Sequence, residues 1–215
     1  MKKAIENNAK VLAIFAVACT AMVSLVSLGT KDRIERQQQK QLLDTLHQVI
    51  AKEQSNNDLY NDCQLISDAD LLGSEQMQTA YVARVNDSAT TVALTTIAPN
   101  GYNGNIELLV AINIDGSLSG VRVLKHKETP GLGDKIETRK DDWILDFNGR
   151  FYTEDNALTW AVKKDGGSFD QFTGATITPR AVVQAVKNAQ IYFAKHKQQL
   201  LSVQPSCHGE INDPA

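Results

Sequence analysis

The run YVARVNDSATTVALTTI, Tyr81 to Ile97, gives the clearest indication of the fold. Two runs rich in β-branched residues, Tyr81 to Val85 and Thr91 to Ile97, flank Asn86-Asp87-Ser88, whose residue types favour tight turns. The pattern predicts a β-hairpin. Further along, the run Ile106 to Ile114, a turn at Asp115-Gly116 and the run Val121 to Leu124 predict a second hairpin. Four consecutive strands indicate an antiparallel sheet.

Two helices are predicted after these strands. Thr178 as N-cap and Pro179 in the first turn signal a helix start. The residues that then recur on one helical face are Val182, Val183, Val186, Ala189 and Phe193, so this helix should pack on the sheet. A short helix is expected over Asp141 to Phe147, burying Trp143 and Phe147. The fold class is therefore α+β, with an antiparallel sheet covered on one face by helices.

The N-terminal segment Val11 to Leu28 contains no charged residue. Its eighteen residues reach about 27 Å as a helix, close to the hydrocarbon thickness of a bilayer. An uncleaved transmembrane helix is favoured over a cleavable signal peptide, because the apolar run is long and no clear A-x-A site follows it. Lysines and arginines lie on both sides of the segment, so charge alone does not orient it.

Composition limits the rest of the chain. Its 215 residues are 42% hydrophobic and carry a net charge of -3, which supports one ordinary domain and gives no reason to expect nucleic acid. The four histidines show no zinc-ligand spacing. Cys63 and Cys207 are the two cysteines beyond the apolar segment. They would pair in an exported domain, although two unpaired buried thiols are an equal alternative on sequence alone.

The stretch Thr173-Gly174-Ala175-Thr176 leads into the last helix. A helix N-terminus presents unpaired N–H groups and the positive end of a dipole, and Gly174 and Ala175 leave room there for an anion such as a phosphate. The hydroxyls of Thr173 and Thr176 would lie beside it, either to donate a hydrogen bond or to be esterified. A simpler interpretation is that Thr176 only helps to cap the helix.

Asp170 to Thr176 resembles the flavinylation motif D-x-x-[S/T]-G-A-[T/S] of FMN-binding domains. The resemblance implies that Thr176 carries FMN through a phosphoester bond, installed from FAD by a magnesium-dependent flavin transferase. It also implies that Asp170 is read by the transferase, or orients Thr176, and has no role in turnover. Thr173, Gly174 and Ala175 would belong to the same cofactor site.

A second motif supports the resemblance. Glu128-Thr129-Pro130-Gly131-Leu132-Gly133 is similar to the E-T-P-G-L-G loop of the same domain, so Glu128, Thr129, Gly131 and Leu132 are expected to line the flavin. Asn113-Ile114-Asp115-Gly116 also matches. With its N-terminal anchor, the whole chain resembles the G subunits of the Rnf-type (Rsx) ion-translocating electron transport complex. The C subunits of the sodium-translocating NADH:quinone reductase are the runner-up, and a non-redox anchored scaffold is a further alternative.

The resemblance implies a cytoplasmic tail (1–10), a transmembrane helix (11–28), a helical stalk (29–55), a periplasmic FMN-binding domain (56–201) and a flexible tail (202–215). The chain would be a covalent-FMN electron carrier at the bacterial inner membrane. Its partners would be the other membrane and iron-sulfur subunits of the complex, with the transferase during maturation. No independent catalytic activity or catalytic residue is expected.

Overall fold

The computed structural model describes residues 2–202 and Cys207. These residues divide into two compact units, one ending at Leu42 and the other starting at Leu43. The first helix, α1 (Lys2–Val49), begins in the first unit and ends in the second. The predicted stalk over 29–55 is therefore divided: Leu46, Val49 and Ile50 are buried in the folded unit, and the helix ends before residue 55.

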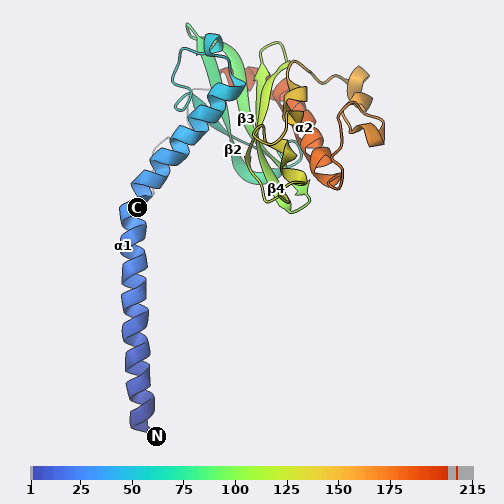
Figure 1. The fold of residues 1–215 in the computed structure, drawn as a ribbon. Coiled ribbons are helices and arrows are strands. Elements are labelled where there is room, and N and C mark those ends of the chain that lie inside the picture. Colours follow the sequence, from blue (N-terminus) through green and yellow to red (C-terminus); the bar gives the residue numbers. More distant parts are fainter. Residues whose placement is uncertain (1, 203–206, 208–215) are drawn as a thin grey trace. The chain divides into compact units, whose positions relative to one another are not determined.

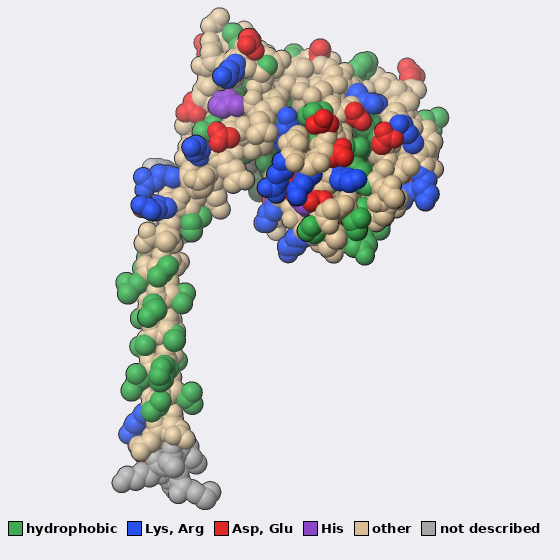
Figure 2. Space-filling model, viewed as in Figure 1, with side chains coloured by type: hydrophobic (Ala, Val, Ile, Leu, Met, Phe, Trp, Pro, Cys, Tyr) green, Lys and Arg blue, Asp and Glu red, His purple; other side chains and the backbone are tan. Residues whose placement is uncertain are grey.

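The first unit contains the apolar part of α1. The large apolar side chains from Val11 to Leu28 are between 53% and 73% exposed, and Figure 2 shows hydrophobic side chains along the visible face of this stretch. The helix is long and apolar enough to cross a membrane by length and composition. A continuous exposed apolar surface of this kind requires a lipid or protein environment.

The second unit contains the remaining elements. They are the 3-10 helix η1 (Lys52–Gln54), the strands β1 (Cys63–Asp68), β2 (Ser74–Val85), β3 (Ser88–Gly101), β4 (Gly104–Asn113) and β5 (Leu118–Lys125), the 3-10 helices η2 (Gly133–Ile136), η3 (Trp143–Phe147), η4 (Glu154–Thr159) and η5 (Lys163–Asp165), and the helix α2 (Ile177–Ser202). The strands form one antiparallel sheet in sequence order, and the predicted α+β class is confirmed (Figure 1).

The hairpin of β2 and β3 has the predicted turn. Asn86 and Asp87 have φ of 50° and 63°, and Val85 pairs with Ser88, so the turn contains two residues. Positive φ at both central residues is the type I′ pattern that Asn and Asp tolerate, and its twist matches that of the strands. Ser88, predicted in the turn, is the first residue of β3.

The edge strand β1 was not predicted. It is short and its sequence, CQLISD, alternates poorly. It contacts the end of α2, because the Gln64 side-chain amide donates a hydrogen bond of 2.7 Å to the Leu200 carbonyl oxygen.

Helix α2 packs on the sheet through the predicted face, and Val182, Val183, Val186, Ala189 and Phe193 are all buried. The short helix η3 buries Trp143 and Phe147, as predicted. One expectation about the layers is wrong. The opposite face of the sheet is also covered by a helix, because a Cβ added at Gly120 would lie 3.2 Å from the Cα of Val49 in α1.

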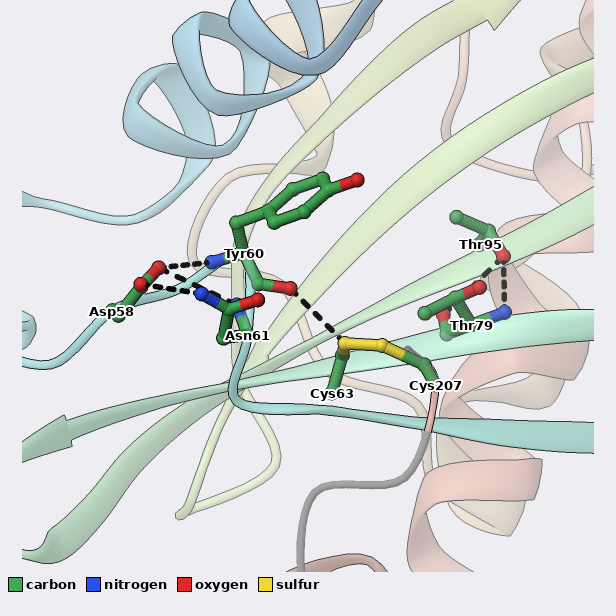
Figure 3. The surroundings of a disulfide bond; sticks show 7 residues. All are labelled: Asp58, Tyr60, Asn61, Cys63, Thr79, Thr95 and Cys207. Carbon is green, nitrogen blue, oxygen red and sulfur yellow. Dashed lines mark hydrogen bonds between the residues drawn. A yellow bond between two sulfur atoms is a disulfide. The ribbon is translucent and has the colours of Figure 1, made fainter. Parts of the chain in front are cut away.

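Cys63 and Cys207 form a disulfide, which decides between the two alternatives that the sequence left open (Figure 3). Their Cα atoms are 5.5 Å apart, and the Cys207 N–H donates to the Cys63 carbonyl oxygen at 3.3 Å. The bond ties the segment after α2 to strand β1. Of the flexible tail predicted over 202–215, residues 203–206 and 208–215 lie outside the described residues.

Candidate functional site

The segment that leads into the Thr-Gly-Ala-Thr turn is anchored in an aromatic cluster. The Phe172 ring lies edge-on to Trp143 with centroids 5.1 Å apart, and Phe169 stacks on Phe147 at 4.5 Å. The Trp143 indole N–H donates to the Asp170 carbonyl oxygen at 2.8 Å. These contacts fix the start of the turn against η3.

The turn itself requires glycine. The Ala175 N–H donates to the Phe172 carbonyl oxygen at 3.2 Å, and Gly174 has φ of +81°, a region that other residues rarely adopt. A Cβ at Gly174 would lie 3.3 Å from Leu132 Cδ2. The turn therefore lies directly beside the Glu128 to Gly133 loop, so the two motifs are neighbours in space. Thr173 is exposed and Thr176 is half-buried.

Helix α2 begins at Ile177, directly after Thr176. The prediction that Thr178 is the N-cap is wrong, because Thr178 is fully buried inside the first turn and its hydroxyl donates to Glu128 Oε2. Pro179 lies in the first turn as predicted. The main-chain N–H groups of a first turn lack partners within the helix, so the end beside Thr176 favours a negative group.

The Glu128 to Gly133 loop is a tight turn with two different glycine roles. The N–H groups of Leu132 and Gly133 donate to the Thr129 carbonyl oxygen at 3.1 and 3.0 Å. Gly131 has φ of +77°, and its N–H donates to Asp134 Oδ1 at 2.8 Å. A Cβ at Gly131 would meet open space, whereas one at Gly133 would lie 2.8 Å from Glu128 Oε2 and 2.9 Å from its Cβ.

Gly133→Ala should therefore destabilise the folded unit by about 1–3 kcal/mol, the usual cost of overpacking. Gly131→Ala, the matched control, should cost about 1 kcal/mol through its positive φ. The measurement is denaturant unfolding of both variants followed by tryptophan fluorescence. A Gly131 variant that is the less stable of the two would show that the close approach at Gly133 is unimportant.

An ion-pair cluster holds the segment beyond the loop. Glu137 accepts hydrogen bonds from Arg139 Nε and from His126 Nε2, the latter at 2.7 Å. The Arg139 guanidinium first, and then His126, hold the pKa of the Glu137 carboxyl below its usual range. Glu137 therefore stays ionised at neutral pH and ties η2 to the end of β5.

A cavity of about 260 Å³ lies where the two motifs meet. Its lining residues are Tyr102, Glu128, Thr129, Leu132, Gly133, Gly174, Ala175 and Thr178. Five predicted site residues thus share one cavity: Glu128, Thr129, Leu132, Gly174 and Ala175. Gly131 and Thr176 are not in its lining, although each adjoins a lining residue in sequence.

Two lining residues outside the two motifs escaped the sequence analysis. Tyr102 is 65% exposed in the β3–β4 connection, where an aromatic residue among glycines and asparagines was the available signal. Thr178 was assigned to capping. Predicted residue Thr173 lines a different cavity of about 370 Å³, together with Asp141, Asp146 and Asp170. A third cavity, of about 390 Å³, includes Trp160, Ile177 and Arg180.

Comparison with protein families matches residues 101–190 to the FMN-binding domain and residues 1–49 to the RnfG N-terminal region. The first match contains both motif segments, Glu128 to Gly133 and Asp170 to Thr176. The second contains the apolar part of α1. Together they assign a known family to the two compact units.

Full-length relatives agree. The G subunit of the ion-translocating oxidoreductase complex of Vibrio atlanticus (strain LGP32) is 50% identical over 210 residues, 98% of this chain and 100% of the relative. The protein of the same name from Shewanella piezotolerans is 49% identical over 207 residues, 96% and 98% of the two chains. That from Shewanella oneidensis is 47% identical over 210 residues, 98% and 99%. The chain therefore belongs to the family of G subunits of the ion-translocating oxidoreductase complex, Rnf-type electron transport proteins with an FMN-binding domain.

Proposed function

We propose that this chain is a membrane-anchored electron carrier of an Rnf-type complex, with FMN attached through a phosphoester to Thr176. One observation carries the proposal. The last hydroxyl of the D-x-x-T-G-A-T match directly precedes α2, and the same turn borders a cavity walled by the second family motif. An acceptor hydroxyl, an anion-favouring helix end and a cavity therefore occur together.

The residues present fit an FMN group. The phosphate would lie at Thr176, where the first turn of α2 favours an anion that stays negative after esterification. The cavity of about 260 Å³ is near the lower limit for small-molecule sites, so it would hold part of the flavin and leave part at the surface. Tyr102 and Leu132 would supply the apolar contacts. FMN, when bound, exchanges electrons one or two at a time.

The covalent bond has a physical purpose in this proposal. Tyr102 is 65% and Leu132 is 42% exposed, so these walls would shield the ring incompletely from water. A carrier held only by such contacts would be lost to a large dilute compartment, whereas an ester bond retains it. The chain would position the flavin and tune its potential, with the other membrane and iron-sulfur subunits of the complex as electron partners.

Maturation by a flavin transferase requires an accessible motif. Asp170 and Lys163 form an ion pair of 2.6 Å with both side chains more than half exposed, and such surface pairs contribute little stability. Thr173 and Gly174 are exposed as well. This exposure supports recognition of Asp170 by the transferase.

The proposal includes a membrane topology, which α1 and the disulfide support. Val11 to Leu28 would span the inner membrane with residues 1–10 in the cytoplasm, and the FMN-binding domain would lie in the periplasm. The Cys63–Cys207 disulfide supports this side, because disulfides persist in the periplasm and are rare in the cytosol. Since the folded unit starts at Leu43, residues 29–42 would form the spacer between membrane and domain.

The apolar segment should remain in the mature protein, because its length exceeds that of a usual signal-peptide core. The check is N-terminal sequencing of the protein extracted from membranes. A chain that begins near Gly29 or Thr30 would contradict the anchor.

The proposal as a whole is tested by producing the full chain with and without a flavin transferase. After denaturing electrophoresis, a fluorescent band is expected only with the transferase, because a bound but unattached flavin is lost on denaturation. A transferase shown to label another flavinylated protein but not this chain would overturn the proposal.

A further inference from the structure

We propose that Glu128 is a positioning residue for the flavin: its buried carboxyl group braces the three segments that wall the cavity and thereby places Thr176. The inference rests on the proposed function and deepens it. The family resemblance places Glu128 in the loop motif but does not assign it this role. The assignment comes from its hydrogen bonds.

The Glu128 side chain is only 5% exposed, and each carboxyl oxygen has a partner in a different segment. Oε1 accepts a hydrogen bond of 3.0 Å from the Asn103 main-chain N–H, in the β3–β4 connection. Oε2 accepts from the Thr178 hydroxyl, in the first turn of α2. Its own N–H donates to His126 Nδ1 at 3.0 Å. One side chain thus joins three parts of the chain.

Each bond lies beside a wall of the cavity. Asn103 follows the lining residue Tyr102, and Thr178 is itself a lining residue, two positions after Thr176. Gly133, in the same loop as Glu128, approaches so closely that an added Cβ would lie 3.0 Å from the Thr178 hydroxyl oxygen as well. The hydrogen bonds of this carboxyl group therefore fix the positions of the hairpin, the loop and the helix end relative to one another.

A carboxyl group would be unusual at position 128 if the side chain there served only for packing. Burial of such a group is costly unless its oxygens are hydrogen-bonded, and among the described residues Glu128 takes part in no ion pair. An apolar side chain would fill the same space without that cost. The two directed hydrogen bonds are what an apolar residue would not supply, and they specify geometry.

If Glu128 were removed, the hairpin and the end of α2 would lose their common partner. The acceptor hydroxyl of Thr176 and the ring walls at Tyr102 and Leu132 would then no longer be held in one arrangement. Attachment should slow, and any flavin that is attached should have a changed environment. A residue needed only for stability would change neither property in molecules that remain folded.

The test uses the full chain with the transferase and four variants. Glu128→Leu removes both bonds. Thr178→Val removes one with almost no change of shape. Glu128→Gln keeps an oxygen for the Asn103 N–H and an amide that can donate to Thr178. Glu107→Gln alters a surface carboxyl that pairs with Lys125 at 3.4 Å and serves as the control.

The initial rate of flavin attachment should fall on the order of tenfold in Glu128→Leu and Thr178→Val, as expected for a lost hydrogen bond to a buried carboxyl. The molecules of these two variants that do carry flavin should have an absorption maximum and a reduction potential shifted from those of labelled wild type. Glu128→Gln should restore both properties toward wild type, and Glu107→Gln should match wild type. Thermal unfolding identifies the folded fraction, to which every rate is normalised.

The outcomes separate the two claims. A labelled wild type, with Glu128→Leu and Thr178→Val labelled at the same rate and with unchanged spectra, would overturn the positioning role alone. A Glu128→Leu variant that does not fold leaves Thr178→Val to decide on the same criteria. A wild type that the transferase does not label would overturn the proposed function and this assignment with it.

Discussion

Thr176→Ala is expected to reduce covalent flavin in the full chain to background, even with the transferase present. The substitution removes the only proposed acceptor oxygen and leaves the Gly174 turn, the cavity and α2 in place. Because Thr176 is half-buried at the surface of the folded unit, loss of its hydroxyl and methyl groups should change stability by no more than about 1 kcal/mol. The effect on labelling should therefore be complete while folding is preserved.

Two companion variants make this test specific. Thr173→Ala removes a hydroxyl from the same turn, but one that is exposed and faces another cavity, so it should reduce labelling less. Thr176→Ser keeps a hydroxyl and should retain part of it. In the wild type, mass spectrometry should find the flavin on the peptide from Asp170 to Arg180. A fluorescent Thr176→Ala band would refute the attachment site.

The parts of the fold that follow from local chemistry could be predicted from the sequence. The turn at Asn86-Asp87 needs positive φ, which these residues tolerate, and the buried face of α2 has helical spacing. Strand β1 could not be found in this way. Its short sequence gives no clear alternation, and its place at the sheet edge depends on pairing with β2, such as Cys63 with Tyr81.

The candidate site likewise has parts that could be predicted from the sequence and parts that could not. The motifs identified the turn and the loop, because each has a glycine that its backbone requires, Gly174 and Gly131. Sequence spacing could not show that Leu132 lies against Gly174, or that the Thr178 hydroxyl donates to Glu128. Such contacts join residues about 40 to 50 positions apart, and they arise only when the loop and α2 pack together.

The disulfide could not be predicted from the sequence either, because pairing requires that the two Cα atoms approach.

Among these predictions, removal of the disulfide should have the second largest effect, a loss of stability. The closed loop spans a sequence separation of 144, for which the chain-entropy model gives a contribution of about 5 kcal/mol. At 2–4 °C per kcal/mol for a chain of this size, Cys207→Ser should lower the melting temperature by roughly 10–20 °C.

The measurement is thermal unfolding of the full chain in detergent, followed through Trp143 and Trp160, which are both buried in the folded unit. Cys19→Ser is the matched control, since Cys19 is an exposed free cysteine, and it should melt like wild type. Reductant should lower the melting temperature of wild type and of Cys19→Ser, and leave Cys207→Ser unchanged. A wild type that is insensitive to reductant, with both thiols free to alkylation, would refute the bond.

A double variant tests how the bond acts. Cys63→Ala, Cys207→Ser and the double variant each lose the same cross-link, so most of the destabilisation should appear in either single variant and little should be added by the second. This non-additivity is expected because the bond acts mainly by restricting the unfolded chain, which either substitution releases completely. Losses that simply add would mean that each cysteine stabilises the fold through its own packing, at the sheet edge for Cys63 and after α2 for Cys207.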